Sequence, residues 1–383
     1  MIGSVSKLNF IIKKLLRKTI NLYKKLNKVK FRFDLPVKKK ILLYDELHSW
    51  ALKEIIKKKF NILKIRDEKE IYFWIFLKQI IFFDFKFKTY CKNYIKFISP
   101  KIVVTFIDTN IDFYELKDSF KNIHFISIQN GIRTPDWFKS KRMKTSKNLK
   151  CDHIFVFNKY IKNKYSNYIN SKYHILGTFK NNIAKVNKTK NNNHFLLISE
   201  FEKSTKVKLN FKKKLLNFIN LYRLKTNKKI HILLKSKDSF KQKEEISFYK
   251  NFFQSDCIFL KSLKWKQSYE IIDRFENIIF MYSTLGYEAI ARKKKVAIFS
   301  PDKIHGFKYY FGWPATYKKS YNFFSTKKLT YSEIKRVLNN ISNCSQINWQ
   351  NKYYSIIKDQ MYLNKKNTKL KKVIFELLED SNK

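Results

Sequence analysis

The sequence predicts an α/β fold made of two Rossmann-like domains that face a common cleft. Short apolar runs alternate with helical stretches along most of the chain, which is typical of βαβ units and a parallel sheet. The length of 383 residues exceeds one ordinary core and suits two. A polar run rich in Asn and Lys, 181–193, interrupts the alternation as a linker. We therefore expect an N-terminal domain over 36–180, a C-terminal domain over 194–350, and a helical C-terminal tail over 351–383.

The expected strands are short runs of apolar and β-branched residues. Before the linker they lie at 40–44, 61–65, 101–106, 124–128, 153–157 and 173–177. After it they lie at 194–199, 229–235, 257–260, 277–282 and 295–300. Helices are expected at 46–58, 68–97, 206–226, 240–253, 267–274 and 284–293, and the pattern is helical beyond 331.

The charge of the chain is its most unusual property. The formal net charge is +52, which raises the question of a polyanionic partner, either nucleic acid or an anionic membrane. The lysines are scattered along the whole length, which favours a general compositional bias. Hydrophobic residues make up 44% of the chain, enough for buried cores and against disorder. No nucleic-acid-binding motif occurs, so no specific nucleic acid is expected as a partner.

The N-terminal unit, 1–35, contains the clearest helical periodicity. Over 7–28, apolar residues recur at helical spacing while the remainder is unusually basic. A basic amphipathic helix can lie on an anionic membrane surface. It can equally pack its apolar stripe on the protein and leave its lysines in water, and the sequence leaves both interpretations open.

Targeting signals and cysteines point to the cytoplasm. No secretory signal pattern is visible, and the apolar run at 71–87 is interrupted by Lys78, Gln79, Asp84 and Lys86, so a membrane span is not expected. The four cysteines are widely spaced, which fits neither a disulfide framework nor a zinc site. We expect a cytoplasmic protein without a metal site, with peripheral binding to the inner face of the plasma membrane left open.

The sharpest candidate for a binding site is the segment NIIFMYSTLGYEA, 277–289. Ligands of open α/β sheets bind beyond the carboxyl ends of the strands, near helix N-termini. Here Ser283 and Thr284 can cap the helix that follows a strand, which leaves its N–H groups and positive dipole end available to a phosphate. Gly286 would let a ligand approach the backbone, and Glu288 could accept hydrogen bonds from ribose or sugar hydroxyls. The alternative is a plain helix cap with a solvated Glu288.

Two further residues follow strands of the C-terminal domain. Lys235 closes the strand at 229–235, where its ammonium group could face the same phosphate. In so lysine-rich a chain, a solvated lysine is the favoured interpretation. Glu200 follows the strand at 194–199 and is a weaker candidate for the same cleft.

Polar residues also follow three strands of the N-terminal domain. A transfer reaction needs a base to take a proton from the acceptor hydroxyl, and the candidates are Glu46, His48 and Asp108. The segment SIQNGIR, 127–133, could be a hairpin turn, but Pro135 and the loss of alternation oppose a returning strand. We therefore expect Gly131 to be the tight exit of a parallel strand. Candidate substrate-binding residues are Asn110, Gln129, Asn130, Gly131 and Arg133.

The common signatures of NTPases, dinucleotide-binding proteins, zinc proteases and serine hydrolases do not occur. Nucleotide-activated donors bound at helix N-termini remain as the natural ligand class.

Four segments together resemble bacterial surface carbohydrate biosynthesis proteins: 103–133, HILGTFKNN, YSTLGYEAIARKKKVAIFS and FGWP. That group is similar to GT-B glycosyltransferases, including the capsule-type Kdo transferases and the CDP-glycerol glycerophosphotransferases of teichoic acid synthesis. The resemblance covers 40–330. It implies an acceptor-side N-terminal half and a nucleotide-sugar-binding C-terminal half. It also implies metal-independent transfer, with the nucleotide sugar as co-substrate and no other cofactor.

Individual residues carry over from this resemblance. Ser283, Thr284 and Glu288 match the donor motif. Gln129, Asn130 and Gly131 match the N-domain loop, and Gly177 and Thr178 stand where relatives have Gly-Ser. The stretch LLKSKDS departs from the Lys-Pro-His-Pro-like stretch of related transferases, which leaves that phosphate contact open. The catalytic base is not assigned by resemblance.

Three functions remain open from the sequence. The first is a glycosyltransferase of capsule, lipopolysaccharide or other surface polysaccharide synthesis, with a glycan or lipid-linked acceptor. The second is a sugar-nucleotide 2-epimerase of the same fold. The third is a basic nucleic-acid-binding protein.

Overall fold

The computed structural model of the chain describes residues 29–66, 69–81, 84, 86–133, 135–146, 148–189, 191–202, 205–253, 257–301, 303–307 and 322–379. The expected basic helix at 7–28 and the FGWP motif lie outside these residues.

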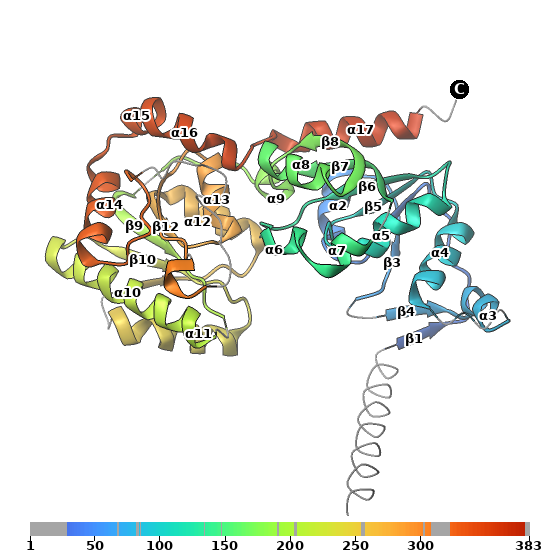
Figure 1. Cartoon of the computed structure of the whole chain (residues 1–383), viewed down its shortest axis with the longest axis horizontal. Helices are drawn as coiled ribbons and strands as arrows, with labels where there is room; N and C mark the ends of the chain where they lie inside the picture. Colours follow the sequence, from blue (N-terminus) through green and yellow to red (C-terminus); the bar gives the residue numbers. More distant parts are fainter. Residues whose placement is uncertain are drawn as a thin grey trace, which may run out of the picture.

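Two domains lie side by side, each built around a parallel sheet (Figure 1). Within the described residues, the sheet of the N-terminal domain has six strands in the order β3-β2-β5-β6-β7-β8, and every pair is parallel. Their bounds are β2 Ile41–Tyr44, β3 Asn61–Leu63, β5 Ile102–Thr105, β6 His124–Ile128, β7 Leu149–Val156 and β8 Ile169–Ile175. The expected α/β class with two Rossmann-like domains is confirmed.

Alternation along each strand sends side chains to both faces of this sheet. Leu42 and Val103 contribute to a core with α4, α5 and α8, whereas Leu43 and Val104 contribute to a second core with α2 and α17. Because both faces are covered, the strands are continuously apolar rather than alternating. The helices are α2 Ser49–Ile56, α3 Phe73–Ile81, α4 Phe87–Ile98, α5 Ile111–Leu116, α6 Pro135–Phe138, α7 Lys141–Thr145, α8 Lys159–Ser166 and α9 Phe179–Ile183.

The C-terminal domain repeats this architecture. Its described strands form a parallel sheet in the order β11-β10-β9-β12-β13. Their bounds are β9 Asn191–Ile198, β10 Ile230–Leu233, β11 Ile258–Leu260, β12 Phe275–Phe280 and β13 Lys295–Ile298. The helices are α10 Lys206–Thr226, α11 Ser239–Phe253, α12 Trp265–Arg274, α13 Thr284–Ala291 and α14 Tyr331–Asn343.

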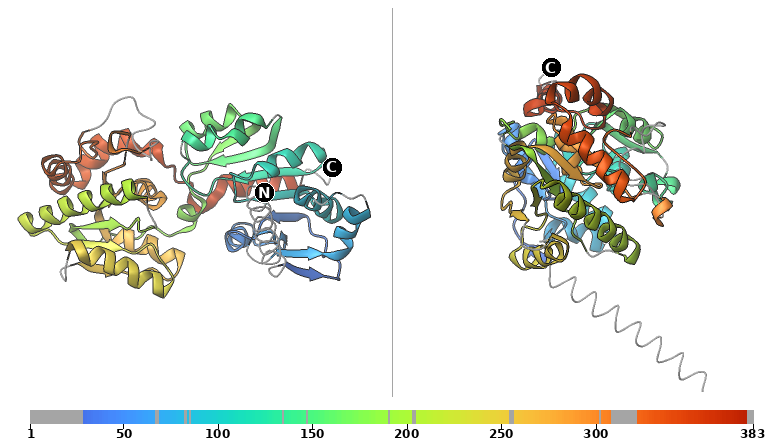
Figure 2. Two further views of the ribbon diagram at one scale, coloured as in Figure 1. Left: turned by 60° about the horizontal axis from the view of Figure 1, so that its bottom comes forward. Right: turned by 90° about the vertical axis from the view of Figure 1, so that its left-hand side faces the viewer.

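The chain then returns to the N-terminal domain. After the short helices α15 Gln346–Asn348 and α16 Ser355–Ile357, the last helix, α17 Thr368–Glu379, buries Leu370 and Ile374 in the N-terminal core (Figures 1 and 2). The returning segment of the chain crosses over Gly177, which forms an isolated antiparallel β-bridge with Leu363. Gly177 has φ +74°, and a Cβ there would lie 1.8 Å from the carbonyl oxygen of Tyr362. Glycine is therefore required at the crossing.

The structure departs from the expected elements mainly near the N-terminus. All eleven expected strands are present, and α10 has the expected bounds. The single helix expected over 68–97 is instead β4 Lys69–Tyr72 followed by α3 and α4. Strand β1 Val29–Arg32, inside the unit expected to be helical, pairs in parallel with β4. Both strands are short and contain no fully buried residue, so they lack the apolar pattern that predicts a strand. Within the described part of the chain, no helix has the length and apolarity to cross a bilayer.

Candidate functional site

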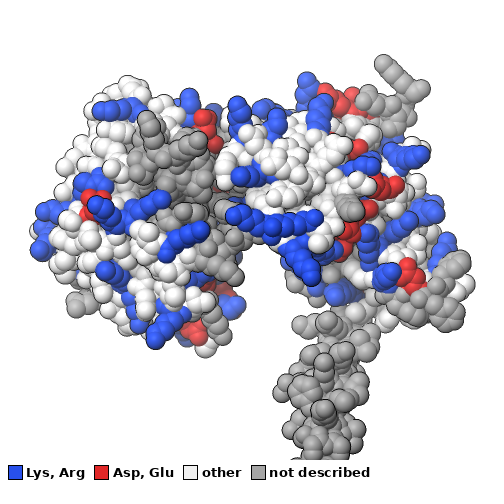
Figure 3. All heavy atoms as spheres, viewed as in Figure 1, with Lys and Arg blue, Asp and Glu red and all other residues white. Residues whose placement is uncertain are grey.

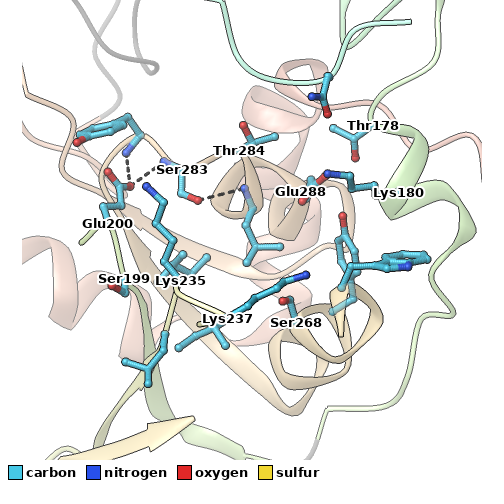
Figure 4. Close-up of a pocket in the computed structure, with 18 of the residues that line it drawn as sticks. Thr178, Lys180, Ser199, Glu200, Lys235, Lys237, Ser268, Ser283, Thr284 and Glu288 are labelled. Carbon is cyan, nitrogen blue, oxygen red and sulfur yellow. Dashed lines mark hydrogen bonds between the residues drawn. The ribbon is translucent and has the colours of Figure 1, made fainter. Parts of the chain in front are cut away.

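A pocket of about 580 Å³ lies between the two domains (Figure 4). The N-terminal domain contributes Leu47, His48 and Asn130, and the connecting segment contributes residues 178–180. The rest of the wall comes from the ends of β9, β10 and β12 and from α12 and α13. The pocket thus lies at the carboxyl ends of the strands, where open α/β sheets bind their ligands.

The N-terminus of α13 opens into this pocket. Ser283 is the N-cap, and its hydroxyl accepts a hydrogen bond from the Leu285 N–H at 3.3 Å. The Thr284 hydroxyl accepts one from the Ile132 N–H of the opposite domain at 3.4 Å. Ser283 and Thr284 therefore hold the positive end of the helix dipole at the pocket and link it to the N-terminal domain.

Gly286 has a different role from the expected one. A Cβ on Gly286 would lie 2.2 Å from the ring of Phe280. The glycine lets α13 pack closely on β12, and the space beside it is filled by that ring rather than by a ligand. The expectation that Gly286 admits a ligand to the backbone is wrong.

Glu288 lies one turn into α13 and lines the pocket, with only 5% of its surface exposed. Burial raises the pKa of its carboxyl group, and the nearby Thr178 and Tyr269 hydroxyls and the Lys180 ammonium group oppose that rise. Figure 4 shows Glu288 beside Lys180 and Thr178. This carboxylate is placed to accept hydrogen bonds from hydroxyl groups of a bound ligand.

Glu200 follows β9 and is almost fully buried. Its Oε1 accepts hydrogen bonds from the N–H groups of Met281 at 3.1 Å, Tyr282 at 2.6 Å and Ser283 at 2.7 Å. Its other oxygen, Oε2, is buried without a hydrogen-bond partner. Burial raises the pKa of Glu200 to about 7 despite those three hydrogen bonds. Glu200 therefore shapes the loop that leads into α13 and leaves one oxygen unsatisfied.

Among the described residues, three lysines line the pocket: Lys180, Lys235 and Lys237. Burial lowers the pKa of Lys180, and the nearby Glu288 carboxylate opposes that change. Lys235 is half exposed and lies 3.7 Å from Glu202. Figure 4 shows Lys235 extending toward Glu200 and Ser283, with Lys237 reaching into the pocket. Together with the α13 dipole, these cations suit an anionic group.

His48 is the titratable side chain that the N-terminal domain contributes to the pocket wall among the described residues. It precedes α2 as the N-cap residue, in a left-handed conformation with φ 60°. Its Nε2 lies 2.8 Å from the Asn130 Oδ1. Burial and the Lys180 charge lower the pKa of His48 to about 4. His48 is therefore neutral at physiological pH, and the contact with Asn130 places the proton on Nε2 and the lone pair on Nδ1.

The other two candidate bases lie outside the pocket wall. Glu46 accepts hydrogen bonds from the N–H groups of Ile65 at 3.0 Å and Arg66 at 3.1 Å, and so ties the end of β2 to the end of β3. Asp108 has no exposed surface. It forms an ion pair with Arg133. It also accepts hydrogen bonds from the Tyr165 hydroxyl and, at 3.1 Å, from the Asn130 N–H. These contacts fit structural roles for both carboxylates and do not bring either to a ligand.

Most of the expected substrate-binding residues form hydrogen bonds within the loops of the N-terminal domain. Asn110 caps α5 by accepting the Asp112 N–H. Gln129 accepts the Phe157 N–H at 2.8 Å and donates to the Gly131 carbonyl at 2.9 Å. Gly131 has no positive φ, and a Cβ there would meet Arg133 only at an ordinary 3.5 Å. The segment leaves the parallel strand β6, as expected, and is not a hairpin turn, but the expectation that this exit is tight enough to need glycine at 131 is wrong. Of this loop, Asn130 alone is in the described pocket wall.

Sequence reasoning missed several residues that shape the pocket. Trp265 and Tyr269 of α12 line it, and Trp265 stacks on Trp50 of the opposite domain with ring centroids 4.4 Å apart. Lys180 and Lys237 carry no distinguishing signal among so many lysines. The tryptophan pair could have been suspected only from the scarcity of tryptophan, since the chain has six.

Two facing Rossmann-like domains, a pocket between them and a C-terminal helix that returns to the first domain define a GT-B-like fold. Residues 126–378, about two thirds of the chain, match the family described as "putative O-antigen biosynthesis protein". The chain belongs to this family.

Solved structures of the same fold are similar at low sequence identity. The UDP-GlcNAc 2-epimerase of Methanocaldococcus jannaschii has a TM-score of 0.51 at 12% identity, covering 88% of this chain and 99% of its own. The same enzyme in complex with UDP-GlcNAc and UDP has a TM-score of 0.50 at 14% identity, with coverage of 88% and 99%. A glycosyltransferase from Rickettsia africae has a TM-score of 0.49 at 12% identity, with coverage of 90% and 100%. Among curated protein sequences, none matches this chain.

Proposed function

We propose that this protein is a glycosyltransferase that moves a sugar from a nucleotide-activated donor to a growing surface polysaccharide or lipopolysaccharide. The observation that supports this most directly is the interdomain pocket, where a helix N-terminus, three lysines and a buried glutamate converge. A nucleotide sugar combines an anionic phosphate link with hydroxyl-bearing rings. The helix N-terminus and the lysines suit the phosphate, and the glutamate suits the hydroxyl groups. Membership of the O-antigen biosynthesis family supports a sugar substrate.

The donor would bind to the C-terminal wall. The phosphate group would face the N-terminus of α13, with Lys235 and Lys237 as counter-charges. Glu288 would accept hydrogen bonds from ribose or sugar hydroxyls. When the bond between the sugar and the phosphate breaks, negative charge grows on the leaving phosphate, and the fixed dipole and ammonium groups stabilise it. Protein cations at this place suit transfer without a metal ion.

The acceptor would enter from the N-terminal side, where His48 is the candidate base. The acceptor hydroxyl attacks the anomeric carbon, its proton passes to Nδ1 of His48, and the nucleotide leaves with the bonding electrons. A neutral imidazole with its tautomer fixed by Asn130 is prepared for this step. His48 and Asn130 both line the pocket, whereas Glu46 and Asp108 do not.

The epimerase alternative finds less support in the pocket. Inverting a ring carbon requires proton removal on one face and return on the other, so acid–base groups must surround the sugar. Among the described lining residues, the carboxylates are Glu200 and Glu288, both from the C-terminal domain. The opposite wall offers His48 and Asn130. The similarity to the epimerase structures is a similarity of fold.

The nucleic-acid alternative finds no single basic stripe among the described residues of the face shown in Figure 3. Figure 3 shows Lys and Arg distributed over both domains of the viewed face rather than gathered in one stripe. That distribution fits the scattered lysines of the sequence.

The test is a panel of nucleotide sugars and free nucleotides, scored by calorimetric binding and by nucleotide release with and without cell-wall glycan acceptors. The comparison variants are Glu288→Gln and Glu244→Gln, the latter changing an exposed glutamate of α11. Loss of a charge-assisted hydrogen bond should weaken donor binding by about tenfold or more in Glu288→Gln, with no change in Glu244→Gln.

The outcomes separate the alternatives. Nucleotide release that depends on an acceptor supports transfer. Conversion of the donor sugar without any acceptor supports epimerisation instead. Failure of every nucleotide and nucleotide sugar to bind overturns the donor site.

A further inference from the structure

An exposed apolar surface lies at the start of the described chain, on β1, the segment that follows it, α3 and the first residue of α4. We call it the aromatic patch, and its centre is Phe31, Phe33 and Trp74. Phe33 is 66% exposed and Trp74 51%, and Leu35, Val37, Ile81 and Phe87, from the same stretches of sequence, are also among the exposed large hydrophobic side chains. Single exposed apolar residues are ordinary, but a contiguous group of aromatic residues marks an interaction surface.

The aromatic patch is held in place by its own contacts. The Trp74 indole donates a hydrogen bond to the Phe33 carbonyl oxygen at 2.7 Å. The rings of Phe33 and Phe73 lie 5.4 Å apart, and those of Phe31 and Phe76 lie 6.5 Å apart. These contacts join β1 and the residues directly after it to α3, so the aromatic side chains are held in place by a folded element.

The stretches of sequence that form the patch are rich in basic residues. The two segments that form it, 29–40 and 69–88, contain nine Lys or Arg and three Asp or Glu. Two of those acids are already paired, Asp34 with Arg32 and Glu70 with Lys64, each at 2.8 Å. The surface therefore combines exposed aromatic rings with an excess of positive charge.

We propose that the aromatic patch docks the protein on an anionic membrane surface. Aromatic side chains enter the boundary between headgroups and acyl chains, while lysines extend their ammonium groups to the lipid phosphates. This inference does not depend on the transfer reaction. Figures 1 and 2 place β1, β4 and α3 at the side of the N-terminal domain away from the C-terminal domain, so docking would leave the interdomain pocket accessible.

The positive charge of the chain favours a membrane over a second copy of the chain as the partner of the aromatic patch. A copy with net charge +52 would bring further positive charge to an already basic surface. The preceding segment, 7–28, also combines an apolar stripe with many basic residues in its sequence, and residue 29 begins β1. Stable membrane attachment usually needs two weak anchors, and these two are adjacent in the chain.

The experiment is co-sedimentation of the full chain with vesicles of phosphatidylcholine alone and of phosphatidylcholine with phosphatidylglycerol. The patch variant is Phe33→Ser with Trp74→Ser. A second variant, Leu35→Ser with Ile81→Ser, removes side chains that are 54% and 63% exposed and spares the Phe33–Trp74 contact. The matched control, Phe240→Ser with Ile258→Ser, removes side chains of the C-terminal domain that are 69% and 51% exposed.

Wild type and control should bind the anionic vesicles and bind the neutral ones much more weakly. Both patch variants should lose about tenfold or more in partition coefficient while keeping the wild-type circular dichroism spectrum. Equal binding by wild type and both patch variants would overturn the proposal and assign any binding to charge or to 7–28. Patch-dependent self-association without vesicle binding would overturn it in favour of a second copy.

Discussion

The carboxyl ends of the two sheets carry similar sets of polar residues but use them in opposite ways. In the N-terminal domain, Asp108 is enclosed by donors from its own domain and has no exposed surface. In the C-terminal domain, Glu288 lines the pocket, and Glu200 keeps one carboxylate oxygen without a partner. The polar groups of one edge are locked within their own domain, whereas those of the other edge line the pocket.

The comparison shows that a residue directly after a strand can be predicted to lie at the carboxyl edge of the sheet. Its position in the sequence does not predict which group its side chain contacts. The N-terminal domain contributes little beyond His48 and Asn130 to the pocket wall described here. The donor half would therefore carry most of the binding contacts, and the acceptor half would carry the base. The following changes test that asymmetry, from the largest expected effect to the smallest.

Replacing Asp108 by Asn should destabilise the protein strongly. The change removes the negative charge that faces Arg133, whose side chain is 14% exposed, and leaves a buried guanidinium group unpaired. Breaking a buried ion pair in this way costs about 3–5 kcal/mol in free energy of unfolding. Urea unfolding followed by circular dichroism measures the loss. A variant of wild-type stability with abolished turnover would instead restore Asp108 as a candidate base.

Replacing Glu200 by Gln should stabilise the protein in a pH-dependent way. The folded pKa of about 7 lies above the ordinary 4.5, so the folded state binds the proton more tightly and the wild type loses stability as pH rises from 4.5 through 7. Gln keeps the acceptor at Oε1 and removes that cost, which is up to about 3 kcal/mol. The difference from wild type should be near zero at pH 4.5 and largest at pH 8. Urea unfolding at both pH values checks this, and a gap that does not change with pH would contradict it.

Replacing His48 by Gln should reduce turnover with little loss of stability. Removing a general base typically costs about a hundredfold or more in rate, equivalent to about 2.7 kcal/mol. Because the pKa of His48 is about 4, the wild-type rate should lose this base only as pH falls toward 4, when the imidazole takes up a proton. Steady-state rates from pH 4 to 8 measure both effects. An unchanged rate in the variant would remove His48 from the mechanism.

The sequence predicted the repeating parts of the fold better than the contacts that decide function. Apolar runs gave every strand of the two main sheets, because burial on both faces leaves a clear pattern. The return of α17 and the pairing of β1 with β4 depend on contacts between distant segments, which no local pattern records. The same holds for Asp108, whose partner Tyr165 is 57 residues away. In the C-terminal domain, Ser283, Thr284 and Glu288 follow one strand in sequence, so the local motif was enough to place them together.

The glycines of the two edges provide the finest comparison. Gly286→Ala places a methyl group 2.2 Å from the ring of Phe280, which forces α13 away from β12 and should cost about 1–3 kcal/mol in free energy of unfolding. Gly131→Ala meets only the Arg133 guanidinium at 3.5 Å and has no positive φ, so it should stay within about 0.5 kcal/mol of wild type. Urea unfolding of both variants decides the matter. Equal losses of stability in the two variants would show that the loop around Gly131 is as tightly constrained as the start of α13. Packing would then not explain the difference between the edges of the two sheets.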